Sequence, residues 1–333
     1  MLTLYAPLVA LVAGIAAGAL YVVGLSHSIW GVFLVLCSPL PIYIASLSFN
    51  SLASGIAGVI AVSGVMAFSD PLLASVFSIA FVLPAFVLGH LATQQVGKTQ
   101  EGDPVFLSAA DMTQILLILG IFLIVISAFA VSMTPAGLVG TIRSNLNLLM
   151  NNFYGAEASH GPDAVTNLAE IVDFWDSLVL GTIIAVVVVS HAAMGSLGQG
   201  LARSGGKTLR PAPAFGRLRL PGWPFYLTLL LGAAVMGLDT LGGDREGTIA
   251  FVIYLLTGFL LVLGVGFLLQ GLAVLHALTR GMNAQPFILA GSYLVVLVFQ
   301  PFGAMVFATV GFVEHWANFR ERFGVDSDAA MED

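Results

Sequence analysis

The sequence predicts an all-α membrane protein, a polytopic bundle of transmembrane helices. Of its 333 residues, 58% are hydrophobic and only 9% are charged, and the mean hydropathy is +0.99. A soluble domain carries roughly 25% charged residues, because water must wet its surface. The apolar residues also collect into runs of about the ~20 residues that a helix needs to cross a bilayer core of ~30 Å. We therefore expect the bilayer to be the solvent of this chain.

Nine apolar runs account for the predicted spans. They are, in order, Leu4–Gly24, Ile29–Leu47, Leu52–Phe68, Leu72–Leu91, Ile115–Val131, Leu178–Met194, Phe225–Leu238, Ile249–Leu278 and Phe287–Phe312. The first run has no basic residue before it and leads into the second without a cleavage-type stretch. We therefore expect it to be retained rather than removed as a signal peptide.

The last two runs leave the number of crossings open between eight and ten. Ile249–Leu278 is long enough to tilt strongly or to break at its glycines. Phe287–Phe312 carries Gln300 and Pro301 in its middle. Because proline interrupts helical hydrogen bonding, this run is either one kinked span or two half-length segments.

Basic residues between the sixth and seventh runs predict the orientation. They are Arg203, Lys207, Arg210, Arg217 and Arg219, with no acidic residue between them. Short basic loops stay on the cytoplasmic side, so we expect a multi-pass protein of the bacterial inner membrane with a cytoplasmic N-terminus. The tail disturbs this pattern, because Arg320 and Arg322 would lie outside unless the last run turns back.

The runs divide the chain into four parts. Residues 1–134 form a five-span bundle, 135–176 a periplasmic insertion, 177–316 a second bundle with a basic cytoplasmic loop at 197–224, and 317–333 a polar tail. In the insertion, apolar residues at helical spacing from Leu138 to Phe153 predict an amphipathic helix. This helix either packs on the bundle or covers an outward-facing cavity as a lid.

Small residues mark faces where helices approach closely. Gly14 and Gly18 lie four residues apart in the first run, and Ala57 and Ala61 do so in the third. Helices in lipid associate through close backbone contact, which small side chains permit. These residues predict either packing within the chain or a face that binds a partner helix.

Polar side chains within the membrane are costly and often functional. The centres of the predicted spans carry almost no ionisable residue, which argues against ion-driven pumping. Three histidines lie near predicted span ends: His90, His191 and His276. A haem or metal site built from two of them is a hypothesis, but because no metal-ligand spacing accompanies them, we expect no cofactor. Gln270, His276 and Arg280 are the candidate site for an anionic ligand or lipid head group, with His276 and Arg280 on one helix face.

Several function classes are excluded or unsupported. The chain has no nucleophile elbow, P-loop, zinc-protease motif or carboxylate pair, so we expect no enzymatic activity. With 11 basic and 18 acidic residues, the net charge is −7, and we expect no nucleic-acid partner. The single cysteine, Cys37, excludes an intramolecular disulfide. The basic loop either contacts anionic lipid or an acidic partner, or only sets the topology.

Five stretches together resemble the YybS-like family of uncharacterised bacterial membrane proteins, and the alphaproteobacterial branch above all. They are Ser38–Ala45, Leu209–Pro213, Leu218–Pro221, Gln270–Gly281 and Phe319–Arg322. Ser190–Met194 and Glu314 depart from the pattern expected of that family. The family is similar in outline to the S-components of energy-coupling-factor transporters, which implies a compact helical core with a cavity opening outward.

Two functions of different classes follow. In the first, which the resemblance favours slightly, the chain is an S-component-like component for binding or transport of a small solute. In the second, it is a non-catalytic structural or accessory subunit of a larger membrane complex. Both predict partners among membrane lipids and either other integral membrane subunits or further copies of the chain. Specific ligand recognition needs a few convergent polar groups, and the spans supply few.

Overall fold

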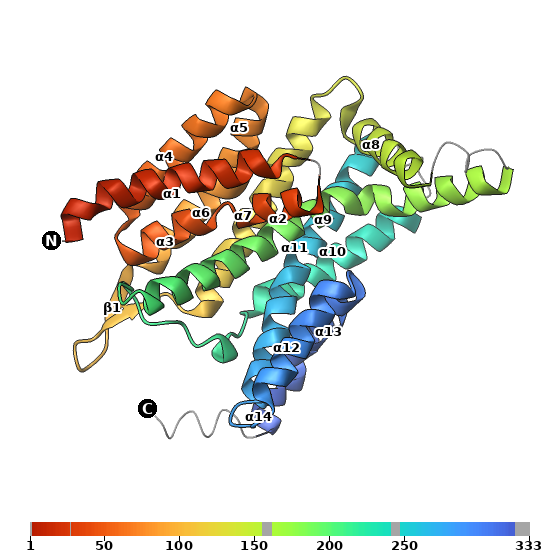
Figure 1. Cartoon of the computed structure of the whole chain (residues 1–333). Coiled ribbons are helices and arrows are strands. Elements are labelled where there is room, and N and C mark those ends of the chain that lie inside the picture. Colours follow the sequence, from red (N-terminus) through yellow and green to blue (C-terminus); the bar gives the residue numbers. More distant parts are fainter. Residues whose placement is uncertain (1, 27, 155–161, 241–246, 324–333) are drawn as a thin grey trace.

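The computed structural model describes residues 2–26, 28–154, 162–240 and 247–323, and the described chain is almost entirely helical (Figure 1). Within it, seven segments are long and apolar enough to cross a membrane. They are Tyr5–Gly24, Ile29–Ser48, Ser51–Phe68, Pro71–Ala92, Ala109–Ser132, Ser177–Ser204 and Thr248–Leu278. Three shorter apolar helices follow the same pattern: Gly222–Leu238, Gln285–Val298 and Phe302–Ala317. The predicted all-α polytopic bundle is confirmed.

Two of the N-terminal spans are interrupted helices. Helices α1 (Leu2–Gly24) and α4 (Ser51–Phe68) are continuous, but the second span consists of α2 (Ile29–Cys37) and α3 (Leu40–Ser48). The fourth span consists of α5 (Pro71–Phe77), a π-helical turn η1 (Ser78–Val82) and α6 (Leu83–Ala92). Proline explains both interruptions, because it has no backbone N–H to donate: Pro39 precedes α3, and Pro84 lies in the first turn of α6.

Helices α1 and α4 are joined by a seam of small residues. A Cβ on Gly14 would lie 2.6 Å from the carbonyl oxygen of Ala57, and one on Gly18 would lie 3.0 Å from that of Ala61. Ala57 and Ala61 are fully buried. For these two glycines and two alanines, the sequence left open packing within the chain or binding of a partner helix. In the structure they pack within the chain. Helix α4 therefore occupies this face of α1, and a partner helix at the same residues stays a prediction.

The middle of the chain adds two long helices to the bundle. A two-stranded antiparallel sheet, β1 (Gln95–Lys98) and β2 (Pro104–Phe106), precedes α7 (Ala109–Ser132). Next come α8 (Gly137–Tyr154) and α9 (Pro162–Ser204), a helix of 43 residues. The apolar face of α8 is anchored to the bundle, since Leu138 and Ile142 are buried in the main hydrophobic core. The start of the predicted amphipathic helix thus packs on the bundle.

The C-terminal part ends in a helical hairpin. Helices α10 (Gly222–Thr240) and α11 (Gly247–Leu278) are followed by α12 (Gln285–Val298), α13 (Phe302–Ala317) and the short α14 (Phe319–Arg322). The run Ile249–Leu278, for which tilting or a break at its glycines was open, lies in one unbroken helix. The run from Phe287 to Phe312 is two half-length helices of 14 and 16 residues, about 21 and 24 Å long at 1.5 Å per residue. The chain turns between them at Gln300 and Pro301, and both helices lie beside α11 (Figure 1).

Because α12 and α13 form a hairpin, the tail that follows α13 lies on the same side of the molecule as the loop before α10. Arg320 Nη1 donates to the carbonyl oxygen of Gly216 in this loop, at 2.9 Å. On the same side, Arg210 Nη1 donates to the carbonyl oxygen of Ala92, the last residue of α6, at 3.1 Å. The loop before α10, the end of the fourth span and the tail therefore share one face of the molecule.

This face, here named the basic side, holds most of the positive charge. Of the eleven Lys and Arg residues, nine lie in segments that end or connect spans on it. They are Lys98, Arg203, Lys207, Arg210, Arg217, Arg219, Arg280, Arg320 and Arg322. The basic tail, which one kinked last span would have placed on the other side, joins them because the hairpin turns back.

Candidate functional site

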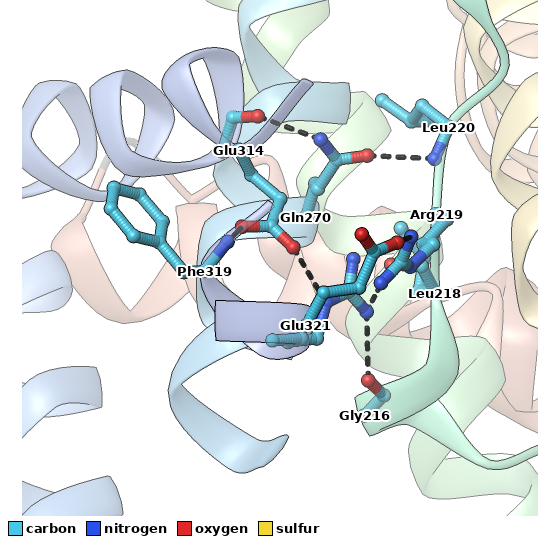
Figure 2. A network of polar contacts seen from close by, with 10 residues as sticks. Gly216, Leu218, Arg219, Leu220, Gln270, Glu314, Phe319 and Glu321 are labelled. Atoms are coloured by element: carbon cyan, nitrogen blue, oxygen red, sulfur yellow. Dashed lines mark hydrogen bonds and ion pairs between the residues drawn. The ribbon is translucent and has the colours of Figure 1, made fainter. Parts of the chain in front are cut away.

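A buried glutamine joins three elements on the basic side (Figure 2). Gln270, on α11, is 3% exposed. Its Oε1 accepts a hydrogen bond from the backbone N–H of Leu220 at 2.7 Å, and its Nε2 donates to the carbonyl oxygen of Gly311 at 2.6 Å. The side chain thereby ties α11 to the loop before α10 and to α13. Because both ends of the amide are engaged, Gln270 acts as a packing residue rather than as part of the predicted ligand site.

Beside it, a buried ion pair anchors the tail. Arg320 Nε donates to Glu314 Oε1 at 2.8 Å, and the two side chains are 1% and 3% exposed. Glu314 Oε2 also accepts from the N–H of Phe319 at 2.7 Å, and Arg320 Nη1 donates to the carbonyl oxygen of Leu218 at 3.0 Å. The left-handed backbone of Asn318, with φ of 47°, turns the chain so that α14 folds back.

The ion pair corrects the prediction of a merely polar tail beginning at 317. Position 320 belongs to the packed structure, whereas Arg219 and Glu321 form an exposed pair, at 3.0 Å with 40% and 55% exposed side chains. Sequence reasoning missed Arg320 and Glu314 as a pair because a six-residue separation across a helix end has no regular spacing. The signal available was a charged residue, Glu314, in an apolar run.

The remaining members of the predicted ligand site lie in other surroundings. His276 Nε2 is 3.0 Å from the hydroxyl of Tyr293, and the ring packs edge-on against Phe215. Arg280 lies just beyond α11 with an exposed side chain. His276 therefore bridges α11 to α12, whereas Gln270 bridges α11 to α13. The structure does not bring the three predicted residues together around one ligand.

A second buried polar cluster lies in the N-terminal bundle. Tyr43 Oη is 3.0 Å from His191 Nδ1, and His191 Nε2 is 2.9 Å from the carbonyl oxygen of Ala80. A carbonyl only accepts, so Nε2 carries the proton, and in the neutral ring Nδ1 accepts from the tyrosine hydroxyl. Both side chains are 2% exposed. The cluster thus joins α3, α9 and the π-helical turn.

The interrupted helices explain why these bonds form. The carbonyl of Ala80 would normally accept from the residue four positions on, which is Pro84 and has no N–H. His191 supplies the missing donor. Similarly, Ser190 Oγ donates to the carbonyl oxygen of Leu36 at 2.6 Å, next to the break between α2 and α3. Freed backbone groups within a membrane need such partners, because lipid supplies none.

His191 also corrects the expectation that the three histidines lie near span ends. The sixth span runs to Ser204 rather than to Met194, so His191 lies at its middle. The span was cut short because Gly195, Gln199 and nearby small residues lower the local hydropathy. Prolines in the second and fourth runs, together with Ser190 and His191, were the signal that could have located this cluster.

A cavity of about 250 Å³ opens on the basic side. It is formed by β2, the first turn of α7 and the loop before α10. Its lining is Pro104, Phe106, Leu107, Ser108, Ala109, Ala110, Arg210, Pro211, Ala212, Pro213, Ala214 and Arg217. Of the five loop cations predicted to bind a partner or lipid, Arg210 and Arg217 reach this cavity. Arg203 is exposed in the last turn of α9, and Lys207 lies 5.4 Å from the ring centre of Phe49.

The histidines do not converge on a metal or haem site. His90 packs against Phe86 and lies 3.4 Å from the Gln94 side chain, whereas His191 and His276 have the separate partners given above. In the part of the chain that the structure describes, no group of three or more His, Cys, Asp or Glu side chains is placed to hold a metal ion. That the protein carries no cofactor stays a prediction.

Comparison with known proteins gives one match. Residues 14–314 match the family model described as "Predicted membrane protein (DUF2232)". No curated protein and no solved structure matches the chain. The match spans every helix described above apart from the first half of α1, the end of α13 and α14.

Proposed function

This chain belongs to the DUF2232 family of predicted membrane proteins, and we propose that it serves as a non-catalytic accessory subunit of a larger membrane complex. The observation that carries the proposal is α12. This helix has no buried residue, and it exposes several large apolar side chains. They are Phe287, Tyr293, Leu294, Val295, Leu297 and Val298.

The hairpin is held firmly but leaves α12 uncovered. A Cβ on Gly271 or Gly311 would overlap with the backbone of the facing helix, so α11 and α13 approach as closely as backbones permit. Helix α12, by contrast, is too short to cross a core of ~30 Å and packs little against its own chain. Because lipid gives no hydrophobic driving force for helix association, a helix with so few internal contacts gains most from packing against another subunit.

Photo-crosslinking tests this proposal in native membranes. A photoreactive amino acid replaces Leu294 on α12, which is 59% exposed, or Leu8 on α1, which is 58% exposed and serves as the matched control. We expect a discrete protein adduct at position 294 and only lipid adducts at position 8. If both positions give lipid adducts alone, the accessory-subunit proposal is wrong.

A specific observation favours the solute-binding transport component as a second candidate. Two interrupted spans meet at a buried ionisable residue, His191, in mid-span, and transporters commonly build their substrate sites from discontinuous helices near the bilayer midplane. Against this candidate, the cavity described above lies on the basic side, whereas an S-component-like core implies one that opens outward.

The proposed transport function is tested by identifying any small molecule that stays bound to the purified protein. The protein is extracted in mild detergent and any co-purifying small molecule is identified by mass spectrometry. The His191→Phe variant should lose that molecule, and Tyr226→Phe, at an exposed tyrosine, should retain it. Wild-type protein that carries no small molecule, or carries it equally in the His191→Phe variant, contradicts a transport role for this cluster.

Orientation completes the proposal. Short basic segments stay in the cytoplasm, so we place the basic side, and with it the start of α1 and the whole of α14, on the cytoplasmic face of the bacterial inner membrane. Among the Lys and Arg residues that the structure describes, only Arg143, on α8, falls in a segment that we place on the other face. This arrangement has eight crossings and one hairpin that does not cross.

A further inference from the structure

The cavity on the basic side contains a buried arginine with an unusual set of partners. Arg210 is 5% exposed. Its guanidinium donates to the carbonyl oxygens of Ala92 at 3.1 Å, Leu107 at 3.2 Å and Pro211 at 3.3 Å. All three acceptors are neutral, and they use three of the five N–H groups of the guanidinium.

Comparison with Arg320 shows what Arg210 lacks. Both arginines are buried, but Arg320 faces the carboxylate of Glu314, whereas no carboxylate among the described residues forms an ion pair with Arg210. Burial lowers the pKa of Arg210, because desolvation disfavours the charged guanidinium. A buried charge is stabilised when an opposite charge lies beside it, and here an external anion can take that place.

The walls of the cavity indicate what kind of anion fits. Apart from the two arginines and Ser108, the lining is apolar, with Pro104, Phe106 and Pro213 among its larger members. At the N-terminus of α7, the carboxylate of Asp111 accepts from the N–H of Ser108, and Ser108 Oγ accepts from the N–H of Asp111. The charged partners that the lining offers an anion are the two guanidinium groups, with apolar contacts around them.

The cavity lies at the ends of the spans, at the depth where lipid head groups are expected. Arg210 is bonded to the last residue of α6, and the cavity is lined by the first residues of α7. Both lie where spans leave the hydrocarbon. Anionic lipids of the cytoplasmic leaflet are drawn to clustered Lys and Arg at this depth, and this side carries nine such residues.

We propose that the cavity beside Arg210 and Arg217 binds the phosphate of an anionic phospholipid. Guanidinium groups match phosphate geometry, and charge-assisted bonds of this type are the strong ones. The prolines and Phe106 contact the apolar part of the same lipid. The site is independent of the proposed subunit contact at α12, so each proposal stands or fails alone.

The test uses delipidated full-length protein in detergent, with binding followed by native mass spectrometry. Phosphatidylglycerol is compared with phosphatidylcholine and with inorganic phosphate. We expect one phosphatidylglycerol to bind tightly and specifically. Ala212→Trp, which fills the cavity mouth without changing charge, and Arg217→Gln should each weaken binding about tenfold.

Arg203→Gln is the matched control, since it removes the same charge from the basic side outside the cavity, in the last turn of α9, and it should bind phosphatidylglycerol like wild type. Arg210→Gln also removes three bonds that hold the loop, so Ala212→Trp keeps the test decisive if that variant fails to fold. Unchanged binding in Ala212→Trp, or equal binding of phosphatidylcholine, overturns the proposal. Displacement of the lipid by equimolar inorganic phosphate overturns the assignment to a lipid and identifies a soluble phosphate instead.

Discussion

The two seams of small residues in this protein differ in what lies beside them. At the α1–α4 seam, Gly14 and Gly18 meet the backbone of α4, and neither helix contains Asp, Glu, Lys or Arg. At the α11–α13 seam, Gly271 and Gly311 meet the facing backbone still more closely, and the buried Glu314–Arg320 pair follows within one turn.

The difference between the two seams shows where this chain, which has few charged residues, uses neutral hydrogen bonds and where it uses a buried ion pair. Within the span region, carbonyl groups beside the interrupted helices accept hydrogen bonds from Ser190 and His191, which need not be charged. On the basic side, where segments leave the lipid, a full ion pair joins α13 to α14, and its Arg320 also donates to the loop carbonyls of Gly216 and Leu218. A buried pair is costly to assemble, but removal of one partner leaves a buried charge, so the pair specifies one arrangement of the tail.

The charged anchor gives the largest expected effect. Glu314→Gln leaves Arg320 buried without its counter-charge, and we expect a loss of about 3–5 kcal/mol in the free energy of unfolding. Thermal unfolding of the purified protein in detergent measures it. Glu321→Gln is the control, because exposed pairs contribute about 0–1 kcal/mol. Equal losses in the two variants would mean that the buried pair is not the anchor.

The α11–α13 seam is expected to be nearly as sensitive. Gly271→Leu forces α13 away from α11, because the new Cβ overlaps with the carbonyl of Phe307, and overpacking costs about 1–3 kcal/mol or more. Gly264→Leu on the same helix meets open space and should unfold at the wild-type temperature. A Gly271→Leu variant as stable as Gly264→Leu would contradict the packing of the hairpin.

The α1–α4 seam should respond less strongly. Gly14→Leu requires the side chain of Ile60 and the backbone of Ala57 to shift by a smaller amount, so we expect about 1–2 kcal/mol of destabilisation. Gly64→Leu, at a glycine of α4 with no neighbour within 4 Å, is the control. If Gly14→Leu instead removes a co-purifying protein without lowering the unfolding temperature, the face binds a partner after all.

The neutral cluster is expected to contribute least to stability. Tyr43→Phe removes the hydroxyl that donates to His191, and hydrogen bonds between membrane helices are worth about 0.6 kcal/mol on average. We expect a loss of about 1 kcal/mol or less in thermal unfolding, with Tyr226→Phe unchanged. A loss as large as that of Glu314→Gln would erase the contrast between neutral and charged networks.

Cysteine accessibility tests the hairpin without affecting stability. In a Cys37→Ala background, single cysteines replace Arg322 in the tail, Gly205 in the basic loop or Ser26 between α1 and α2. A membrane-impermeant thiol reagent applied to intact cells should label position 26 only, whereas inverted vesicles should allow labelling of 322 and 205. Labelling of 322 together with 26 would mean that the last segment crosses the membrane.

Much of the fold follows from hydropathy alone, because lipid demands long apolar helices whatever their neighbours. The predicted runs match the described helices except where local composition misleads. The sixth run ended too early at Met194, and Phe287–Phe312 left one span or two helices open. The candidate site was predicted less accurately than the fold. Gln270, His276 and Arg280 lie close together in the sequence but have different neighbours in the structure.

The sequence by itself determined that this is an all-α membrane protein whose positive charge gathers in a few segments, because composition and run length reflect the solvent and not the partners. Only the tertiary structure decided which polar groups meet. Three contacts join residues whose spacing follows no periodic rule. They are the pairing of Glu314 with Arg320, the donation from His191 to the carbonyl of Ala80, and the bonds that hold Arg210 beside a cavity. Such contacts depend on which helices cross, and helix crossing is set by close packing in three dimensions.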